Sequence, residues 1–98
     1  MKCKIEVKEE ARQDILKAAQ WYEEQQKGLG IRFTENTLNH IQYLAEYPLS
    51  YQCKYKENRE LLVKDFPYVI VYRLVNNSTV FVLAVAHYKQ HPTKKRKR

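Results

Sequence analysis

Residues 66–73 read FPYVIVYR and residues 80–89 read VFVLAVAHYK. These two runs determine the fold, because both are rich in the β-branched and aromatic residues that favour strands. Asn76, Asn77 and Ser78 lie between them, and asparagine tolerates the positive φ that a tight hairpin turn requires. We therefore predict a β-hairpin, with the triplet His87-Tyr88-Lys89 at the point where its second strand leaves the sheet.

The residues before this hairpin predict one further strand and two helices. Residues 4–7 alternate as a short strand does, and apolar residues then recur at helical spacing from Ala11 to Tyr22. The Gly28-Leu29-Gly30 segment ends this helix, because glycine adopts the left-handed conformation that follows many helices. A second helix is expected over residues 31–46, closed by Pro48.

Three strands complete the prediction, over residues 59–64, 69–75 and 79–87. The order β-α-α-β-β-β indicates an α+β fold, an antiparallel sheet with a helical hairpin packed on one face. The other face is expected to stay partly open. We expect the bulkier alternating sets, Ile70, Tyr72 and Leu74 with Phe81, Leu83, Val85 and His87, to meet the helices. In this register Arg59, Arg73, Tyr88 and Lys89 would converge near one end of the sheet.

Length and charge limit the function. Ninety-eight residues form one domain, predicted over residues 1–92, followed by a basic tail at residues 93–98 that is expected to be disordered. The net charge is +7, and it is uneven: residues 1–50 carry −1 and residues 51–98 carry +8. This asymmetry favours a polyanionic partner, either nucleic acid or an acidic protein segment.

Location and redox state follow from what the sequence contains. No apolar run is long enough to span a bilayer, and no signal peptide follows Met1, so we expect a cytoplasmic protein that does not contact membranes. Cys3 and Cys53 are expected to stay reduced, as small residues of the core or the sheet edge. The three histidines lack the spacing of a zinc site, so neither a metal nor another cofactor is predicted.

His87 is the best candidate for acid–base chemistry, because histidine titrates near neutrality and this one lies at a strand end. The alternative is a histidine that caps the sheet edge through a backbone hydrogen bond. His40 is expected on the solvent side of its helix, and His91 on the surface. Five basic residues form a second group that could bind phosphate or stabilise negative charge: Lys54, Lys56, Arg59, Arg73 and Lys89. The alternative is a solvated basic surface.

Three parts of the chain together resemble the RelE/ParE toxin superfamily, in its ParE-like or plasmid-stabilisation branch. Residues 14–33 resemble its helical hairpin, and residues 59–72 with Pro48 resemble its middle strands. Residues 82–87 with Pro92 resemble its last strand and exit. The resemblance implies the toxin of a type II toxin–antitoxin pair, neutralised by an antitoxin protein that wraps across the sheet and helices. It implies one of two targets, DNA gyrase or messenger RNA on the ribosome.

Departures from the family pattern bear on the mechanism. RelE-type nucleases have an arginine directly after the tyrosine that matches Tyr68, and this chain has Val69 there. We therefore favour a toxin that inhibits gyrase by binding. The alternative is a ribosome-dependent mRNA endonuclease, with His87 as acid or base, Tyr88 orienting it, and Arg59 and Arg73 on the scissile phosphate. A third possibility is a basic binding module without toxicity.

Overall fold

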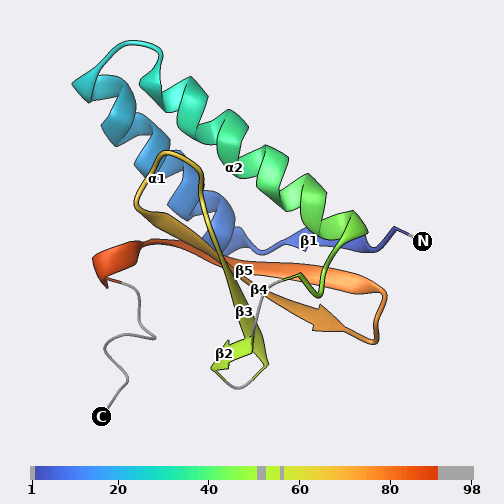
Figure 1. Ribbon diagram of the computed structural model, residues 1–98. Coiled ribbons are helices and arrows are strands. Elements are labelled where there is room, and N and C mark those ends of the chain that lie inside the picture. The colour runs from blue at the N-terminus through green and yellow to red at the C-terminus, as the bar shows by residue number, and fades with distance from the viewer. Residues whose placement is uncertain (1, 51–52, 56, 91–98) are drawn as a thin grey trace.

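The computed structural model describes residues 2–50, 53–55 and 57–90, and has two layers, a helical hairpin over one face of a sheet (Figure 1). The hairpin consists of α1 (Glu9–Gln25) and α2 (Leu29–Glu46). The sheet contains β1 (Lys4–Val7), β2 (Cys53–Tyr55), β3 (Asn58–Leu62), β4 (Tyr68–Val75) and β5 (Thr79–His87), and a short 3-10 helix η1 (Tyr88–Gln90) follows. The predicted tail, residues 93–98, lies outside the described residues.

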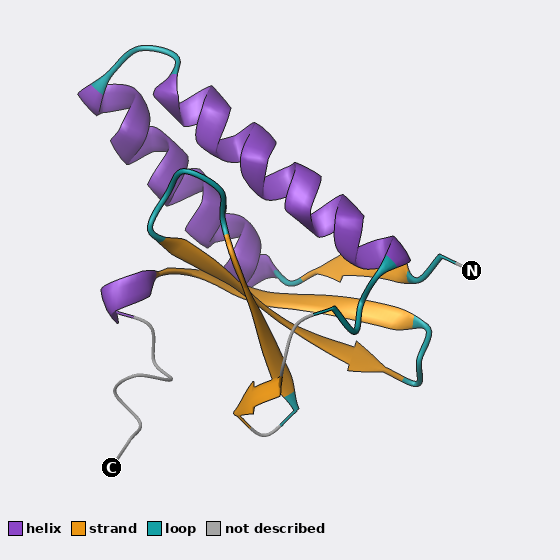
Figure 2. Cartoon of the chain, viewed as in Figure 1, coloured by secondary structure: helices purple, strands orange, loops and turns teal. Residues whose placement is uncertain are grey.

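The α+β class and the hairpin-on-sheet architecture are confirmed, with two refinements to the sheet. Its order is β1-β5-β4-β3-β2, and β1 pairs in parallel with β5, so the sheet is mixed rather than wholly antiparallel. Residue alternation shows that β1 is a strand, but it carries no information about the direction of a partner 75 residues away. The short edge strand β2, which we did not predict, has too few residues to show an alternation (Figure 2).

Two glycines shape the link between the helices for different reasons. Gly28 precedes α2 with φ +90°, a left-handed conformation as predicted. Gly30 was expected in the link but lies inside α2, where an added Cβ would overlap the Ala19 carbonyl oxygen of α1. Glu23 fixes the link, because its carboxylate accepts hydrogen bonds from the Gly28 N–H at 2.8 Å and the Gly30 N–H at 3.0 Å. The glycine at position 30 thus sets how closely the helices pack.

The core lies between the hairpin and the sheet. From the helices it takes Ala11, Ile15 and Ala18 of α1 and Phe33, Ile41 and Leu44 of α2; from the sheet it takes Leu61, Ile70, Tyr72, Val80, Val82 and Val85. An aromatic cluster closes it near the β3–β4 turn, with ring centroids of Tyr22 and Phe33 5.4 Å apart and those of Phe33 and Tyr68 5.2 Å apart.

Ile70 and Tyr72 of β4 face the helices, as predicted. In β5 the predicted orientation is wrong for the first part of the strand, at Phe81 and Leu83. Val71 lies opposite Ala84 and Tyr72 lies opposite Val82, so Leu83 is an extra residue in β5. This bulge reverses the alternation within the strand. Val80 and Val82 therefore face the helices before the bulge in place of Phe81 and Leu83, and Val85 faces them after it.

The hairpin turn is as predicted. Asn76 and Asn77 both have φ of 56°, and the Ser78 N–H donates to the Val75 carbonyl at 3.1 Å. Two successive residues with positive φ define the turn whose twist matches paired strands. Among the described residues, neither helix is long and apolar enough to cross a membrane.

Candidate functional site

His87 lies at the end of β5 on the helix-facing side of the sheet. It pairs with Tyr68 of β4, and the two rings are 5.3 Å apart at an angle of 71°. Its Nδ1 accepts a hydrogen bond from the Lys89 N–H at 3.2 Å. The alternative prediction, a histidine that caps the sheet edge through a backbone hydrogen bond, therefore holds in part. The ring accepts this bond from the backbone and does not donate it.

This bond determines what the His87 ring can do chemically. When Nδ1 is an acceptor, the neutral ring carries its proton on Nε2. In this state Nε2 is a donor, and the lone pair of Nδ1 is already engaged. The ring is thus arranged to donate a hydrogen bond through Nε2, and Nδ1 could take up a proton only after the Lys89 contact breaks.

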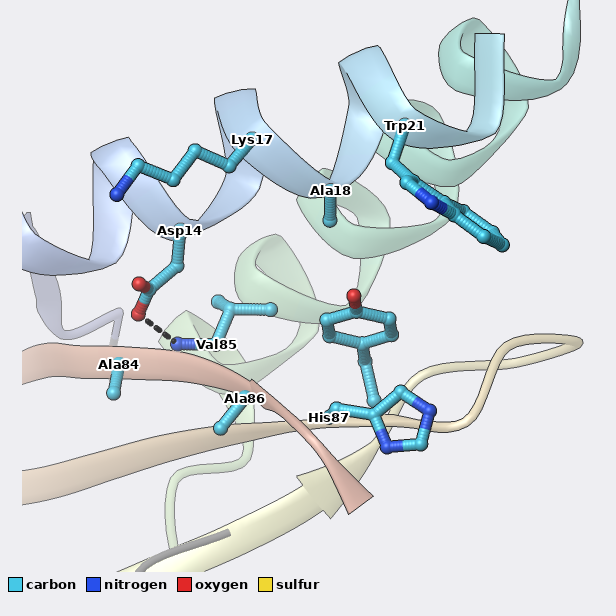
Figure 3. A pocket seen from close by; sticks show the side chains of 9 residues that line it. Asp14, Lys17, Ala18, Trp21, Ala84, Val85, Ala86 and His87 are labelled. Atoms are coloured by element: carbon cyan, nitrogen blue, oxygen red, sulfur yellow. Dashed lines mark hydrogen bonds between the residues drawn. The ribbon is translucent and has the colours of Figure 1, made fainter. Parts of the chain in front are cut away.

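His87 opens onto a pocket between α1 and β5 (Figure 3). The pocket has a volume of about 510 Å³, within the range of about 300–1,000 Å³ that is typical of small-ligand sites. Its walls are Asp14, Lys17, Ala18 and Trp21 from α1, and Tyr68 with residues 84–87 from the sheet. A second pocket of about 380 Å³ shares three of these residues and adds Tyr22 and Pro67. Together they form an aromatic-lined cleft at the end of the sheet.

Asp14 connects the helix wall of this pocket to the strand wall. Its Oδ2 accepts a hydrogen bond from the Val85 N–H at 3.0 Å. Because β1 ends opposite Val82, residues 83–87 of β5 have no strand on their outer side within the described sheet. The carboxylate therefore satisfies a backbone donor that a neighbouring strand would otherwise bind.

The phenols of the pocket have raised pKa values. Burial is the larger cause for Tyr68, and the negative charge of Asp14 adds to it. Burial also raises the pKa of Tyr22, with a smaller contribution from Tyr68. Both shifts favour the neutral phenol, so each hydroxyl remains a hydrogen-bond donor at neutral pH.

The two predicted arginines lie on opposite faces of the sheet. Arg59 of β3 pairs with Tyr72, whose buried ring faces the helices, so Arg59 is on the helix side. Arg73 follows Tyr72 in β4 and is therefore on the open face, where its Nε donates to Asn58 Oδ1 at 3.1 Å. Their predicted convergence is wrong, because adjacent residues of a strand point to opposite faces.

Neither arginine lies near His87. Arg59 is opposite Tyr72 and His87 is opposite Tyr68, so their positions are four residue steps apart along β4. At about 3.3 Å per residue this is about 13 Å along the strand.

The other predicted residues are distributed as follows. Tyr88 and Lys89 lie in η1, beyond His87, and the Tyr88 N–H donates to the Pro67 carbonyl at 2.6 Å. Lys54 is the middle residue of the edge strand β2. Lys56, His91 and Pro92 lie outside the described residues. No group of three or more potential metal ligands occurs within the described ranges.

His40 is not the solvent-side residue that we expected. It is half-buried, and its Nε2 accepts a hydrogen bond from the Lys64 N–H at 3.0 Å. Burial lowers its pKa, and the positive charge of Lys64 lowers it further. This histidine attaches α2 to the end of β3 and has a structural role.

The sequence interpretation missed Asp14, Lys17 and Trp21 as site residues. Their spacing of three and four residues places them on one side of α1, which is visible in the sequence. The sequence did not show that this side of α1 would lie against the end of β5 that has no strand on its outer side (Figure 3).

Comparisons with known proteins agree with this architecture. The family model described as the ParE toxin of the type II toxin–antitoxin system parDE matches residues 5–92. A chain of the chromosomal ParDE system from P. aeruginosa has a similar structure, with TM-score 0.75 and 11% identity, over 87% of this chain and 95% of that one. A free-state mutant of the E. coli toxin RelE gives TM-score 0.71 and 16% identity, over 97% and 93%. No curated protein sequence matches.

Proposed function

Because this chain belongs to the ParE toxin family of type II toxin–antitoxin systems, we propose that it arrests growth by binding DNA gyrase. The family implies an antitoxin protein as its partner. In this proposal the toxin acts in the cytoplasm, where gyrase is found, and needs no cofactor.

The separation of the candidate nuclease residues supports binding over cleavage. Cleavage of a phosphodiester by side chains alone needs an acid, a base and a cation within hydrogen-bond reach of one phosphate. Arg59 and Arg73 lie on opposite faces of the sheet, and His87 is about 13 Å from the Arg59 position along β4. This placement of the two arginines is the observation that carries the proposal.

Val69 gives independent support. It stands where the RelE-type nucleases have an arginine, and its side chain is only 4% exposed. Val71, two residues along the same face, is 7% exposed. This part of the open face is thus apolar and packed, and it offers no cation to a phosphate.

The target contacts are assigned in this proposal to the basic second half of the chain, which carries a charge of +8. Arg59 and Lys89 supply charge from β3 and η1, and Lys54 and Lys56 belong to the same basic half of the sequence. Complementary charge accelerates association and selects partners more than it adds affinity. The same positive charge suits the acidic segment expected of a neutralising antitoxin.

Induction of the protein without an antitoxin tests the proposal. We expect growth arrest, relaxation of plasmid supercoiling, and no new transcript ends when RNA ends are sequenced. Induction of His87→Ala serves as the matched control and should arrest growth equally. New ribosome-dependent transcript ends that appear within minutes of induction would reject the binding mechanism, and harmless induction would reject toxicity itself.

Ribosome-dependent mRNA cleavage is the second candidate. One observation favours it: the His87 ring, with its proton on Nε2, lines an open pocket and is followed directly by Tyr88. In this mechanism His87→Ala and Arg59→Ala would each abolish the transcript ends and relieve growth arrest. If both variants remain fully toxic, the assignment fails.

A further inference from the structure

The pocket between α1 and β5 has features that gyrase binding leaves unexplained. Trp21 is the only tryptophan of the chain, and its side chain is 54% exposed although it stands beside a cluster of buried aromatic rings. Its ring meets Tyr22 edge to face, with centroids 5.1 Å apart. In Figure 3 the indole extends from α1 over the open side of the pocket, above His87. A flat aromatic ligand could stack between them, because stacking on an aromatic side chain needs only an accessible π-face.

The opposite end of the pocket is polar. Among the residues that the structure describes, Asp14 accepts a hydrogen bond from the Val85 N–H through Oδ2. A carboxylate offers about four acceptor positions and no donor, so capacity remains for a ligand that presents two donors. Lys17 stands one helical turn further along α1 and lines the same pocket. The Tyr68 hydroxyl adds a donor to the wall.

We propose that this pocket binds a guanine base, which stacks on Trp21 and donates its N1–H and N2–H₂ groups to Asp14. Guanine alone among the common bases presents two adjacent donors on its Watson–Crick edge, and this matches an acceptor-only carboxylate. Guanine also presents an acceptor there, O6, but it lies beyond the two donors. Adenine and cytosine present a single donor group beside an acceptor, and uracil a single donor between two acceptors, so none of the three offers a carboxylate two adjacent donors. Readout of an unstacked base by its Watson–Crick edge and by aromatic stacking is a general mode of nucleic-acid recognition.

The single tryptophan makes the proposal directly measurable. Guanosine 5′-monophosphate should quench Trp21 fluorescence saturably, with a Kd at least about tenfold below those of the adenosine, cytidine and uridine monophosphates, a difference of about 1.4 kcal/mol. Absence of saturable quenching up to about 10 mM, or equal quenching by all four nucleotides, overturns the proposal.

Asp14→Asn tests the recognition step without removing the strand contact. The asparagine oxygen can still accept the Val85 N–H, but the amide now presents a donor to the ligand. We expect the preference for guanine to disappear, with affinity for the guanine nucleotide reduced at least about tenfold. The matched control is Glu24→Gln, an exposed carboxylate on the same helix outside the pocket, which should change nothing. Equal guanine affinity in wild type and a folded Asp14→Asn contradicts the proposal.

The guanine could belong to a free nucleotide or to a single strand. A tetranucleotide with one guanosine among uridines separates these sources: tighter binding than the mononucleotide indicates a strand, and equal binding indicates the free nucleotide. The unpaired end of β5 beside the pocket could instead accept an extended peptide. Saturable quenching by an uncharged, strand-forming pentapeptide and not by the guanine nucleotide would overturn the proposal in favour of a peptide site.

Discussion

Gly30→Ala should destabilise the protein, although alanine is the better helix former. An added Cβ would overlap the Ala19 carbonyl oxygen and lie 3.0 Å from Glu23 Cβ. The oxygen belongs to the backbone of α1 and has no rotamer to change, so the helices must separate. Overpacking of this kind costs about 1–3 kcal/mol or more, whereas alanine in a helix regains about 1 kcal/mol.

The steric cost exceeds the gain in helix propensity because the Ala19 oxygen, a backbone atom, cannot move without moving α1. We expect a net loss of about 2 kcal/mol in the free energy of unfolding, or a fall in Tm of roughly 8–16 °C for a domain of this size. Urea and thermal unfolding followed by circular dichroism measure both quantities.

Gly28 provides the matched control. Apart from its chain neighbours, no atom of the described residues lies within 4 Å of a Cβ built there, so the cost of a side chain arises from φ, +90°. Gly28→Ala should therefore cost about 1 kcal/mol, and Gly28→Asn less, since asparagine tolerates this conformation. If Gly30→Ala is as stable as the wild type or more stable, helix propensity outweighs packing, and the close approach of α1 and α2 is refuted.

Three further predictions concern single side chains. Tyr72→Phe removes the bond from a buried hydroxyl to the Pro48 carbonyl at 2.9 Å and should cost about 1 kcal/mol in urea unfolding; no loss would show that the bond contributes nothing net. The pKa of His40 is lowered in the folded protein, so as pH falls the unfolded chain binds a proton before the folded chain does. The free energy of unfolding should therefore fall as pH drops below 6.5, the ordinary histidine pKa. The fall should be smaller in His40→Gln, which can still accept the Lys64 N–H, and identical pH profiles of the two proteins would contradict this. His87→Ala and Arg59→Ala should both retain growth arrest upon induction, and a loss of arrest with either variant, when the protein is folded, would favour cleavage.

The elements of this fold could be predicted because the information is local. The alternation of residues 4–7 and 79–87 gave the bounds of β1 and β5 as the structure has them, and Asn76-Asn77 gave the turn. The facing of Phe81 and Leu83 could not be predicted, because the bulge at Leu83 appears only when β5 pairs with β4.

The candidate site was predicted less well than the fold, since a site depends on which distant segments meet. His87 was identified from its own strand end. Asp14 and Trp21 required knowledge that α1 lies beside the free end of β5. Arg59 and Arg73 were expected together on the register assumed for their strands. A difference of one residue in register was enough to place them on opposite faces.

Gyrase supercoiling by the purified protein tests the central claim most directly. Relaxed plasmid, gyrase and ATP are incubated with increasing amounts of toxin, and the supercoiled product is resolved on a gel. Wild type and His87→Ala should inhibit equally as toxin approaches stoichiometric excess, because the activity is assigned to a binding surface and not to that ring. Full supercoiling in the presence of excess folded toxin would contradict the account.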